Sequence, residues 1–197
     1  MIILCFGPFL FVYAAPASLE PESFNGIPWG AHIDTIPGMK KIASQEGIDV
    51  YTRENDILAF AGEIVTTIEY YFYQNKFMGV YITFDGFLRF TAIKKSLCQS
   101  YGPGKKRNYF LEEYSWLQES LLITLSYTAR TGSGSILYCY LPLWEKHLEN
   151  EKKDGTQDHP FFETVRERLS ILVKFETYLT IFPWGEICLS NIPHPGK

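Results

Sequence analysis

The sequence predicts an α+β protein: an antiparallel sheet with one helix packed on a face, followed by a C-terminal amphipathic helix. Three observations lead to this prediction. Residues 64–85 alternate with a period of two and are rich in β-branched and aromatic side chains, which is typical of paired strands. Residues 90–101 repeat apolar side chains at steps of three and four, which is typical of a helix. Three more strands are expected at 109–116, 121–128 and 135–141, and their short links favour antiparallel pairing.

The segment 64–85 predicts a hairpin whose register follows from its apolar residues. A three-residue loop at 74–76 gathers the apolar side chains on one face, namely Ile64, Ile68, Phe72, Met78, Val80, Ile82 and Phe84. A two-residue loop would separate Phe72 from this set. Because a slip of one residue moves every side chain to the other face, the pattern selects the longer loop, with Asn75 or Lys76 in left-handed geometry.

The other face of the predicted hairpin carries an aromatic stripe around Glu69. This aromatic stripe consists of Tyr71, Tyr73, Phe77 and Tyr81. Tyrosine combines a broad apolar ring with a polar end, a composition enriched at recognition surfaces, so these four are the candidate ligand-binding residues. The alternative is that the apolar side of the predicted helix 160–179 covers the stripe. Burying two apolar faces together is more favourable than leaving both in water, and this favours the covered arrangement.

Local signals place the ends of the remaining elements. Residues 48–53 alternate and predict a further strand, and a polar turn leads from there into 57–61. The helix 90–101 is expected to end at Gly102, because glycine accepts the left-handed conformation of a C-terminal cap. Pro103 then prevents the helix from continuing.

The chain of 197 residues is long enough for one ordinary domain with additions. The expected order is a signal peptide at 1–17, a linker at 18–23, the α+β domain at 24–142, a charged connector at 143–159, the amphipathic helix at 160–179 and an irregular tail at 180–197. A net charge of −4 gives no electrostatic reason to expect binding to nucleic acid.

Residues 1–17 contain no charged side chain and combine an apolar run with small residues, which favours a secretory signal peptide. As a helix the run 2–13 would extend about 18 Å, short of the roughly 30 Å hydrocarbon core of a membrane. No lysine or arginine precedes Lys40, so the positive region of a signal peptide is missing, and a buried N-terminal element is the alternative. The expectation is therefore a periplasmic or secreted protein without a transmembrane span after signal removal.

The cysteines and histidines indicate no metal site. Without Cys5, the chain keeps Cys98, Cys139 and Cys188, which allow at most one disulfide and do not have the spacing of a zinc site. Cys98 falls on the predicted helix and Cys139 in a predicted strand, so both are interpreted as small buried apolar side chains. The histidines lie in different segments, and none is paired at metal-ligand spacing. No cofactor is expected.

Catalytic groups are also scattered. Glu112 and Glu113 are neighbours on a predicted strand, so their side chains point to opposite faces and cannot act together. The favoured function is therefore a non-enzymatic binding or accessory domain. One alternative is a hydrolase whose site assembles from distant groups, for which the candidates are His32, His147, Glu69 and Glu112. The other alternative is a structural homo-oligomer joined through the helix 160–179.

Short motifs occur in a distinctive order along the predicted domain. They are Gly26-Ile27-Pro28-Trp29-Gly30, Tyr51-Thr52-Arg53, Ile68-Glu69-Tyr70-Tyr71-Phe72-Tyr73 and Tyr101-Gly102-Pro103. Their order resembles a group of uncharacterised exported bacterial proteins, over roughly residues 24–142. The resemblance implies a cell-envelope location and a strand–helix–strand plan. It implies no activity and no binding residues. Separately, the signal-like N-terminus and the aromatic stripe favour a partner among envelope proteins or cell-wall components.

Overall fold

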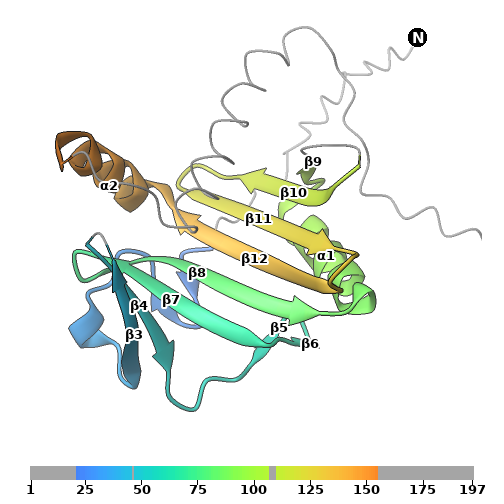
Figure 1. Cartoon of the computed structure of the whole chain (residues 1–197), viewed down its shortest axis with the longest axis horizontal. Helices are drawn as coiled ribbons and strands as arrows, with labels where there is room; N and C mark the ends of the chain where they lie inside the picture. The colour runs from blue at the N-terminus through green and yellow to red at the C-terminus, as the bar shows by residue number, and fades with distance from the viewer. Residues whose placement is uncertain (1–20, 46, 107–109, 155–197) are drawn as a thin grey trace, which may run out of the picture.

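An eight-stranded sheet organises the part of the chain that the computed structural model describes, which is residues 21–45, 47–106 and 110–154 (Figure 1). Its strands are, in spatial order, β3 (Met39–Gln45), β4 (Ile48–Arg53), β7 (Thr67–Tyr73), β8 (Lys76–Asp85), β12 (Ser133–Tyr140), β11 (Leu121–Thr128), β10 (Glu112–Leu117) and β9 (Lys105–Lys106). Every neighbouring pair is antiparallel. The predicted antiparallel sheet is confirmed, and the two edge strands β3 and β9 are additions to it.

Smaller elements surround the sheet. Two short hairpins are formed by β1 (Ser23–Phe24) with β2 (Ile27–Pro28), and by β5 (Ala59–Phe60) with β6 (Glu63–Ile64). The helices are η1 (Ile33–Thr35, a 3-10 turn), α1 (Phe87–Tyr101) and α2 (Leu141–Asp154). None of the helices in the described part of the chain is long and apolar enough to cross a membrane.

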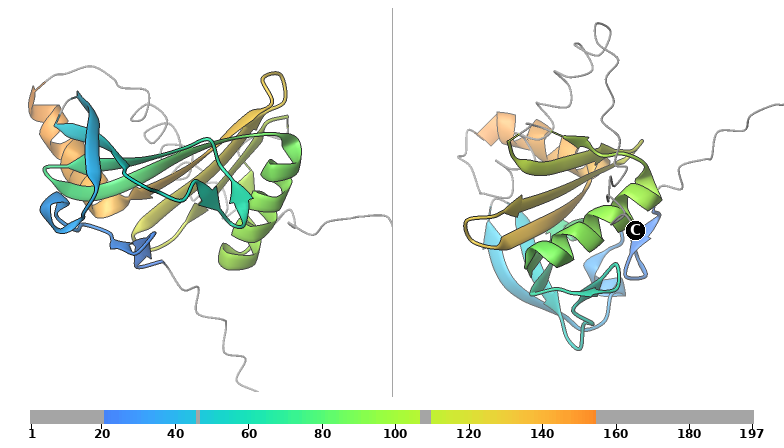
Figure 2. Two further views of the ribbon diagram at one scale, coloured as in Figure 1. Left: turned by 90° about the horizontal axis from the view of Figure 1, so that it is seen from below. Right: turned by 90° about the vertical axis from the view of Figure 1, so that its right-hand side faces the viewer.

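The helix α1 packs on one face of the sheet and closes the larger core (Figure 2). Its buried residues are Phe90, Ile93 and Leu97, and they share a cluster with Ile68, Val80, Ile82 and Phe84 of the central strands. Each such side chain contributes roughly 1.5–3 kcal/mol when it leaves water. The predicted contact between the apolar hairpin face and this helix is confirmed. Gly102 follows the helix with a φ of 78°, a conformation that glycine adopts readily.

The opposite face carries a second core, and α2 supplies its outer layer. Leu143 and Trp144 are buried there together with Tyr71, Tyr73, Met78, Leu122 and Leu137. The charged connector expected at 143–159 is helical up to Asp154, as part of α2, and one side of this helix is buried while the other is exposed. Composition alone is misleading here, because the charged residues of α2 alternate with apolar residues whose spacing places them on one side of the helix. The predicted signal peptide, helix 160–179 and tail lie outside the described residues.

The turn between β7 and β8 corrects the predicted register. Tyr73 pairs with Lys76, so the loop contains two residues, Gln74 and Asn75, and not three. Both have positive φ (48° and 63°), as in the type I′ turns that match the twist of paired strands. Asparagine tolerates this conformation better than most residues, which favours the shorter loop here.

A β-bulge then restores the alternation farther along β8. Tyr71 pairs with Gly79 while Phe72 pairs with Phe77, so Met78 is an extra residue on β8. The bulge places Phe77 in the larger core, where its ring stacks on Trp29, and Met78 in the core on the α2 face, the reverse of the predicted faces. Ile64 also departs from its predicted face, because it lies in β6 with 69% of its surface exposed.

The β1–β2 hairpin is anchored to the sheet by Trp29. The indole stacks on the ring of Phe77, with ring centroids 4.8 Å apart, and its Nε1 donates a hydrogen bond to the Pro21 carbonyl oxygen over 2.7 Å. Trp29 is partly buried and packs against the larger core. The hairpin turn, Asn25-Gly26, has positive φ at both residues. Trp29 thus fixes the turn that forms one wall of the site described below.

Candidate functional site

The aromatic stripe does not form one exposed surface. Tyr71 and Tyr73 are only 5% and 4% exposed and lie in the core beneath α2, whereas Phe77 is fully buried on the other face of the sheet. Tyr81 is half-buried on the face that α2 covers. The predicted grouping of four residues is therefore corrected, because the bulge in β8 removes Phe77 from it.

The hydroxyl groups of Tyr71 and Tyr73 are engaged within the protein. Tyr71 Oη donates to Glu69 Oε2 over 3.0 Å, and Tyr73 Oη accepts from Asn150 Nδ2 over 2.6 Å. The Tyr73 ring also meets the His147 ring edge-on, with centroids 5.1 Å apart. Burial, reinforced by the Glu69 carboxylate, raises the pKa of Tyr71. These contacts make Tyr71 and Tyr73 a packing surface for α2. The predicted cover, the helix 160–179, lies outside the described residues.

The four groups considered for a hydrolase have separate partners. His32 is exposed at the start of η1, with its Nδ1 3.2 Å from Asp34 Oδ2. His147 is buried against Tyr73 and Trp144, and Glu69 accepts from Tyr71. Within residues 21–45, 47–106 and 110–154, no cluster of three His, Cys, Asp or Glu side chains is arranged to hold a metal ion.

Glu112 belongs to a polar network between α1 and β10. Lys94 Nζ donates to Tyr114 Oη over 2.6 Å, and Tyr114 Oη donates to Glu112 Oε2 over 2.8 Å. Burial lowers the pKa of Lys94. Partial burial acts to raise the pKa of Glu112, but the Tyr114 hydrogen bond and the charge of Lys106 hold it below its usual range. Because these side chains satisfy one another, the network is best explained as a support for α1.

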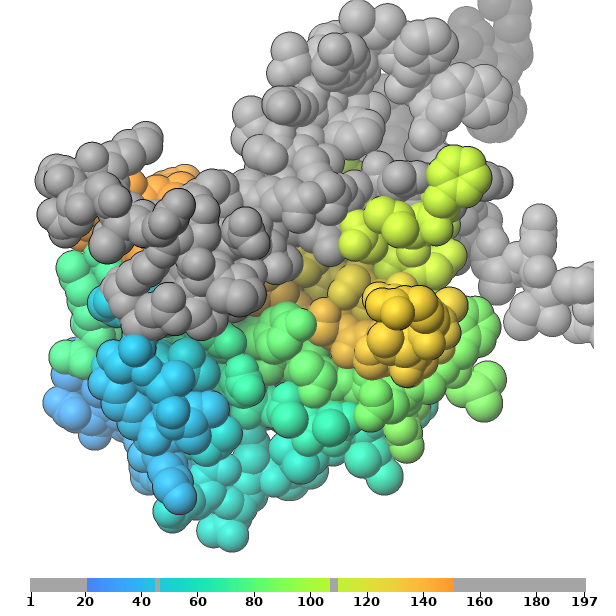
Figure 3. All heavy atoms as spheres, viewed as in Figure 1, coloured from blue at the N-terminus to red at the C-terminus, as the bar shows by residue number. Residues whose placement is uncertain are grey.

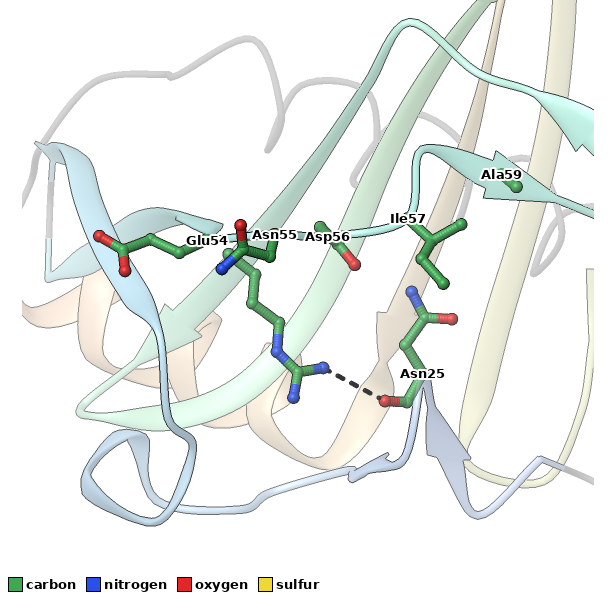
Figure 4. A pocket seen from close by; sticks show the side chains of 7 residues that line it. Asn25, Glu54, Asn55, Asp56, Ile57 and Ala59 are labelled. Atoms are coloured by element: carbon green, nitrogen blue, oxygen red, sulfur yellow. Dashed lines mark hydrogen bonds between the residues drawn. The ribbon is translucent and has the colours of Figure 1, made fainter.

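A polar hollow opens between the β1–β2 turn and the link that joins β4 to β5 (Figure 4). Its volume is about 510 Å³. The residues that line it are Asn25, Arg53, Glu54, Asn55, Asp56, Ile57 and Ala59. Most of them are polar or charged, and Arg53 and Asp56 are half-buried while the others are exposed. The size falls within the range of small-ligand sites.

Tyr70 fixes the geometry of the polar hollow from below. This residue lies in the middle of β7 and is fully buried, and its Oη donates to Asp56 Oδ2 over 2.6 Å. The same oxygen accepts from Asn25 Nδ2 over 3.3 Å. Burial, and then the hydrogen bond to Asp56, raises the pKa of Tyr70, so the phenol keeps its proton for the carboxylate. One core side chain thus holds both walls of the polar hollow.

Arg53 supplies the positive charge of the polar hollow. Its Nη1 donates to the Asn25 carbonyl oxygen over 3.5 Å, a long hydrogen bond. Arg53 takes part in none of the ion pairs found in the described part of the chain, although Glu54 and Asp56 line the same polar hollow. A guanidinium has five N–H donors, so most of its donor capacity is available to a ligand. The polar hollow is therefore lined by a positive and a negative side chain that form no ion pair with each other.

Comparison with known proteins finds no matching family model, no matching curated protein and no matching solved structure. The resemblance to exported bacterial proteins thus stays a prediction. Among its motifs, Trp29 and Tyr101 pack against the core and Arg53 lies in the polar hollow. Sequence reasoning missed this site because Asn25 is distant in the chain, and the only local signal was a charged turn at 53–56.

Proposed function

We propose that this protein is an exported, non-enzymatic binding domain of the cell envelope, and that it binds its partner at the polar hollow. The observation that carries the proposal is the state of Arg53, which faces a ligand-sized space with one long hydrogen bond and no ion pair among the described residues. Holding opposite charges apart gives the folded protein little stability. A ligand that pairs with them would gain strong, charge-assisted hydrogen bonds.

Export is supported by the sequence of residues 1–17, which contain no charged side chain and combine an apolar run with small residues. Sequencing the N-terminus of the mature protein tests export, and a mature chain that retains residues 1–17 would contradict it.

A binding role is favoured over catalysis because the acid and base candidates are occupied elsewhere. Glu69 accepts from Tyr71, and Glu112 accepts from Tyr114 and Lys106. In the polar hollow, the Asp56 carboxylate accepts from Tyr70, which suits a fixed recognition group. Envelope proteins and cell-wall components are the proposed partners, in keeping with the envelope location.

The binding proposal is tested by titrating the isotope-labelled full chain with peptidoglycan fragments and with envelope extract. Backbone NMR shifts are expected at Asn25, Asn55 and Asp56, and Arg53→Gln should abolish them. Arg130→Gln is the matched control, since Arg130 is exposed in the turn between β11 and β12, which projects from the surface in Figure 3. Shifts confined to other regions would reject the polar hollow as the binding site.

A further inference from the structure

Two side chains of opposite charge, Arg53 and Asp56, line the polar hollow. In Figure 4 the side chains of Asp56 and Ile57 extend toward Asn25, whereas that of Glu54 extends to the other side. The hydrogen bond from Arg53 to the Asn25 carbonyl oxygen brings the guanidinium to the same end. The inner part of the polar hollow therefore combines one cation, Arg53, with one anion, Asp56.

This pairing of charges limits the ligands that fit. A ligand with a single negative charge would gain at Arg53 and lose at Asp56, and a single positive charge would do the reverse. A ligand that carries both charges gains at both groups. Its carboxylate can take two parallel hydrogen bonds from the guanidinium, the geometry for which arginine is best suited.

The remaining atoms of the polar hollow suit a short peptide. Asp56 Oδ2 accepts from Tyr70, and among the described residues no hydrogen bond involves Oδ1, which leaves it for an ammonium group. The carboxamides of Asn25 and Asn55 can donate to and accept from a peptide unit. Ile57, which is 77% exposed, and Ala59 offer apolar contact to a small side chain.

We infer that the polar hollow binds a short peptide with free ends, its carboxylate at Arg53 and its ammonium group at Asp56. The inference rests on the proposed function, because it names the ligand class of the same site. An extended dipeptide spans about 7 Å, so its two charged ends can reach groups that lie too far apart to pair with each other. A neutral sugar would use the hydrogen bonds of the polar hollow and leave both charges without a counter-charge.

Calorimetric titration and NMR of the full chain with three probes test the ligand class. The probes are alanyl-alanine, its N-acetylated and amidated form, and N-acetylglucosamine. The free dipeptide is expected to saturate shifts at Asn25 and Asn55. Arg53→Gln and Asp56→Asn should each weaken binding about tenfold or more, because each removes a charge-assisted hydrogen bond. The control Arg130→Gln should bind as the parent does.

The possible failures separate the ligand class from the site. If the capped dipeptide or the sugar shifts Asn25 and Asn55 as strongly as the free dipeptide, recognition of two charges is overturned and the polar hollow remains a binding site. If no probe shifts these residues while peptidoglycan fragments do, the peptide class is again overturned. If neither probes nor fragments shift them, both the inference and the proposed site fail. Thermal melts of each variant show whether lost binding reflects lost folding, and Asp56→Asn retains an oxygen for Tyr70.

Discussion

Replacing Gly134 with alanine tests how closely β8 and β12 are packed. Gly134 pairs with Phe84 across these strands, and the Phe84 ring covers the glycine so closely that no side chain fits. A Cβ added at Gly134 would lie 2.3 Å from Phe84 Cζ, 2.5 Å from Phe84 Cε2 and 2.8 Å from the Ser126 carbonyl oxygen. Carbon atoms in contact prefer separations of about 3.5–4.0 Å, so the ring must withdraw by more than about 1 Å.

The expected cost of Gly134→Ala follows from the absence of free space around Phe84. Phe84 is 1% exposed, so its ring cannot swing into solvent, and the Ser126 oxygen is held by the sheet. Overpacking of this kind costs about 1–3 kcal/mol, and alanine returns about 0.4–1 kcal/mol by stiffening the unfolded chain. We expect a net loss of about 1–2 kcal/mol in the free energy of unfolding, measured by urea denaturation with tryptophan fluorescence.

A double-mutant cycle identifies Phe84 as the source of this cost. Phe84→Ala alone should lose about 3–5 kcal/mol, because it empties a buried site. In that background, Gly134→Ala should cost much less than in the parent, since the ring that it meets is gone. An alanine at 134 that leaves the unfolding midpoint unchanged, or that costs the same in both backgrounds, would refute the close packing described for this pair.

The remaining predictions concern α1, the buried tyrosines and the cysteines. Leu97→Ala should destabilise the fold by about 2–5 kcal/mol in the same urea assay, because it leaves a cavity between α1 and the sheet; a loss below 1 kcal/mol would contradict that packing. Burial raises the pKa of several tyrosines, among them Tyr70, Tyr71 and Tyr138. Their contribution to stability is therefore complete below the unfolded pKa near 10 and is lost at higher pH. Above about pH 10 the urea midpoint should therefore decrease, and phenolate absorbance from these buried tyrosines should appear only as the protein unfolds. Phenolates of these three tyrosines that form in the native state would contradict the prediction. For the cysteines, Cys139 is a free and fully buried thiol, so an alkylating reagent should spare it in the native chain and modify it in urea, as read by peptide mass spectrometry; equal labelling in both states would contradict its burial.

The parts of the fold that follow from local pattern were predictable. The strand 121–128 was predicted with the bounds that β11 has, because its apolar residues lie between two clear turn signals in the sequence. The helix α1 was predicted because Phe90, Ile93 and Leu97 define one side within a few turns, and the structure extends it only at the N-terminal end, to Phe87. Such elements depend on residues that are close in the chain.

The misses have non-local causes. The apolar pattern around the hairpin turn was interpreted without a bulge, yet the bulge at Met78 lets a two-residue turn and the apolar alternation coexist. The edge strand β3 was missed because it pairs with one neighbour only, and Lys40 and Lys41 hide its alternation. The polar hollow depends on Asn25 meeting Arg53, and the buried hydroxyl that joins its walls belongs to Tyr70, a residue predicted from sequence only as part of a strand.

The sheet order has a consequence for the folding rate. Most strands pair with their neighbour in sequence, which makes β3–β4, β7–β8 and β10–β11–β12 local units. The pairing of β8 with β12 joins residues as distant as Gly79 and Cys139, and it is the seam that unites the two halves of the sheet. Closing so large a loop has an entropic cost before any contact compensates it. Pairing of β8 with β12 should therefore limit the folding rate, on a timescale of milliseconds to seconds rather than microseconds.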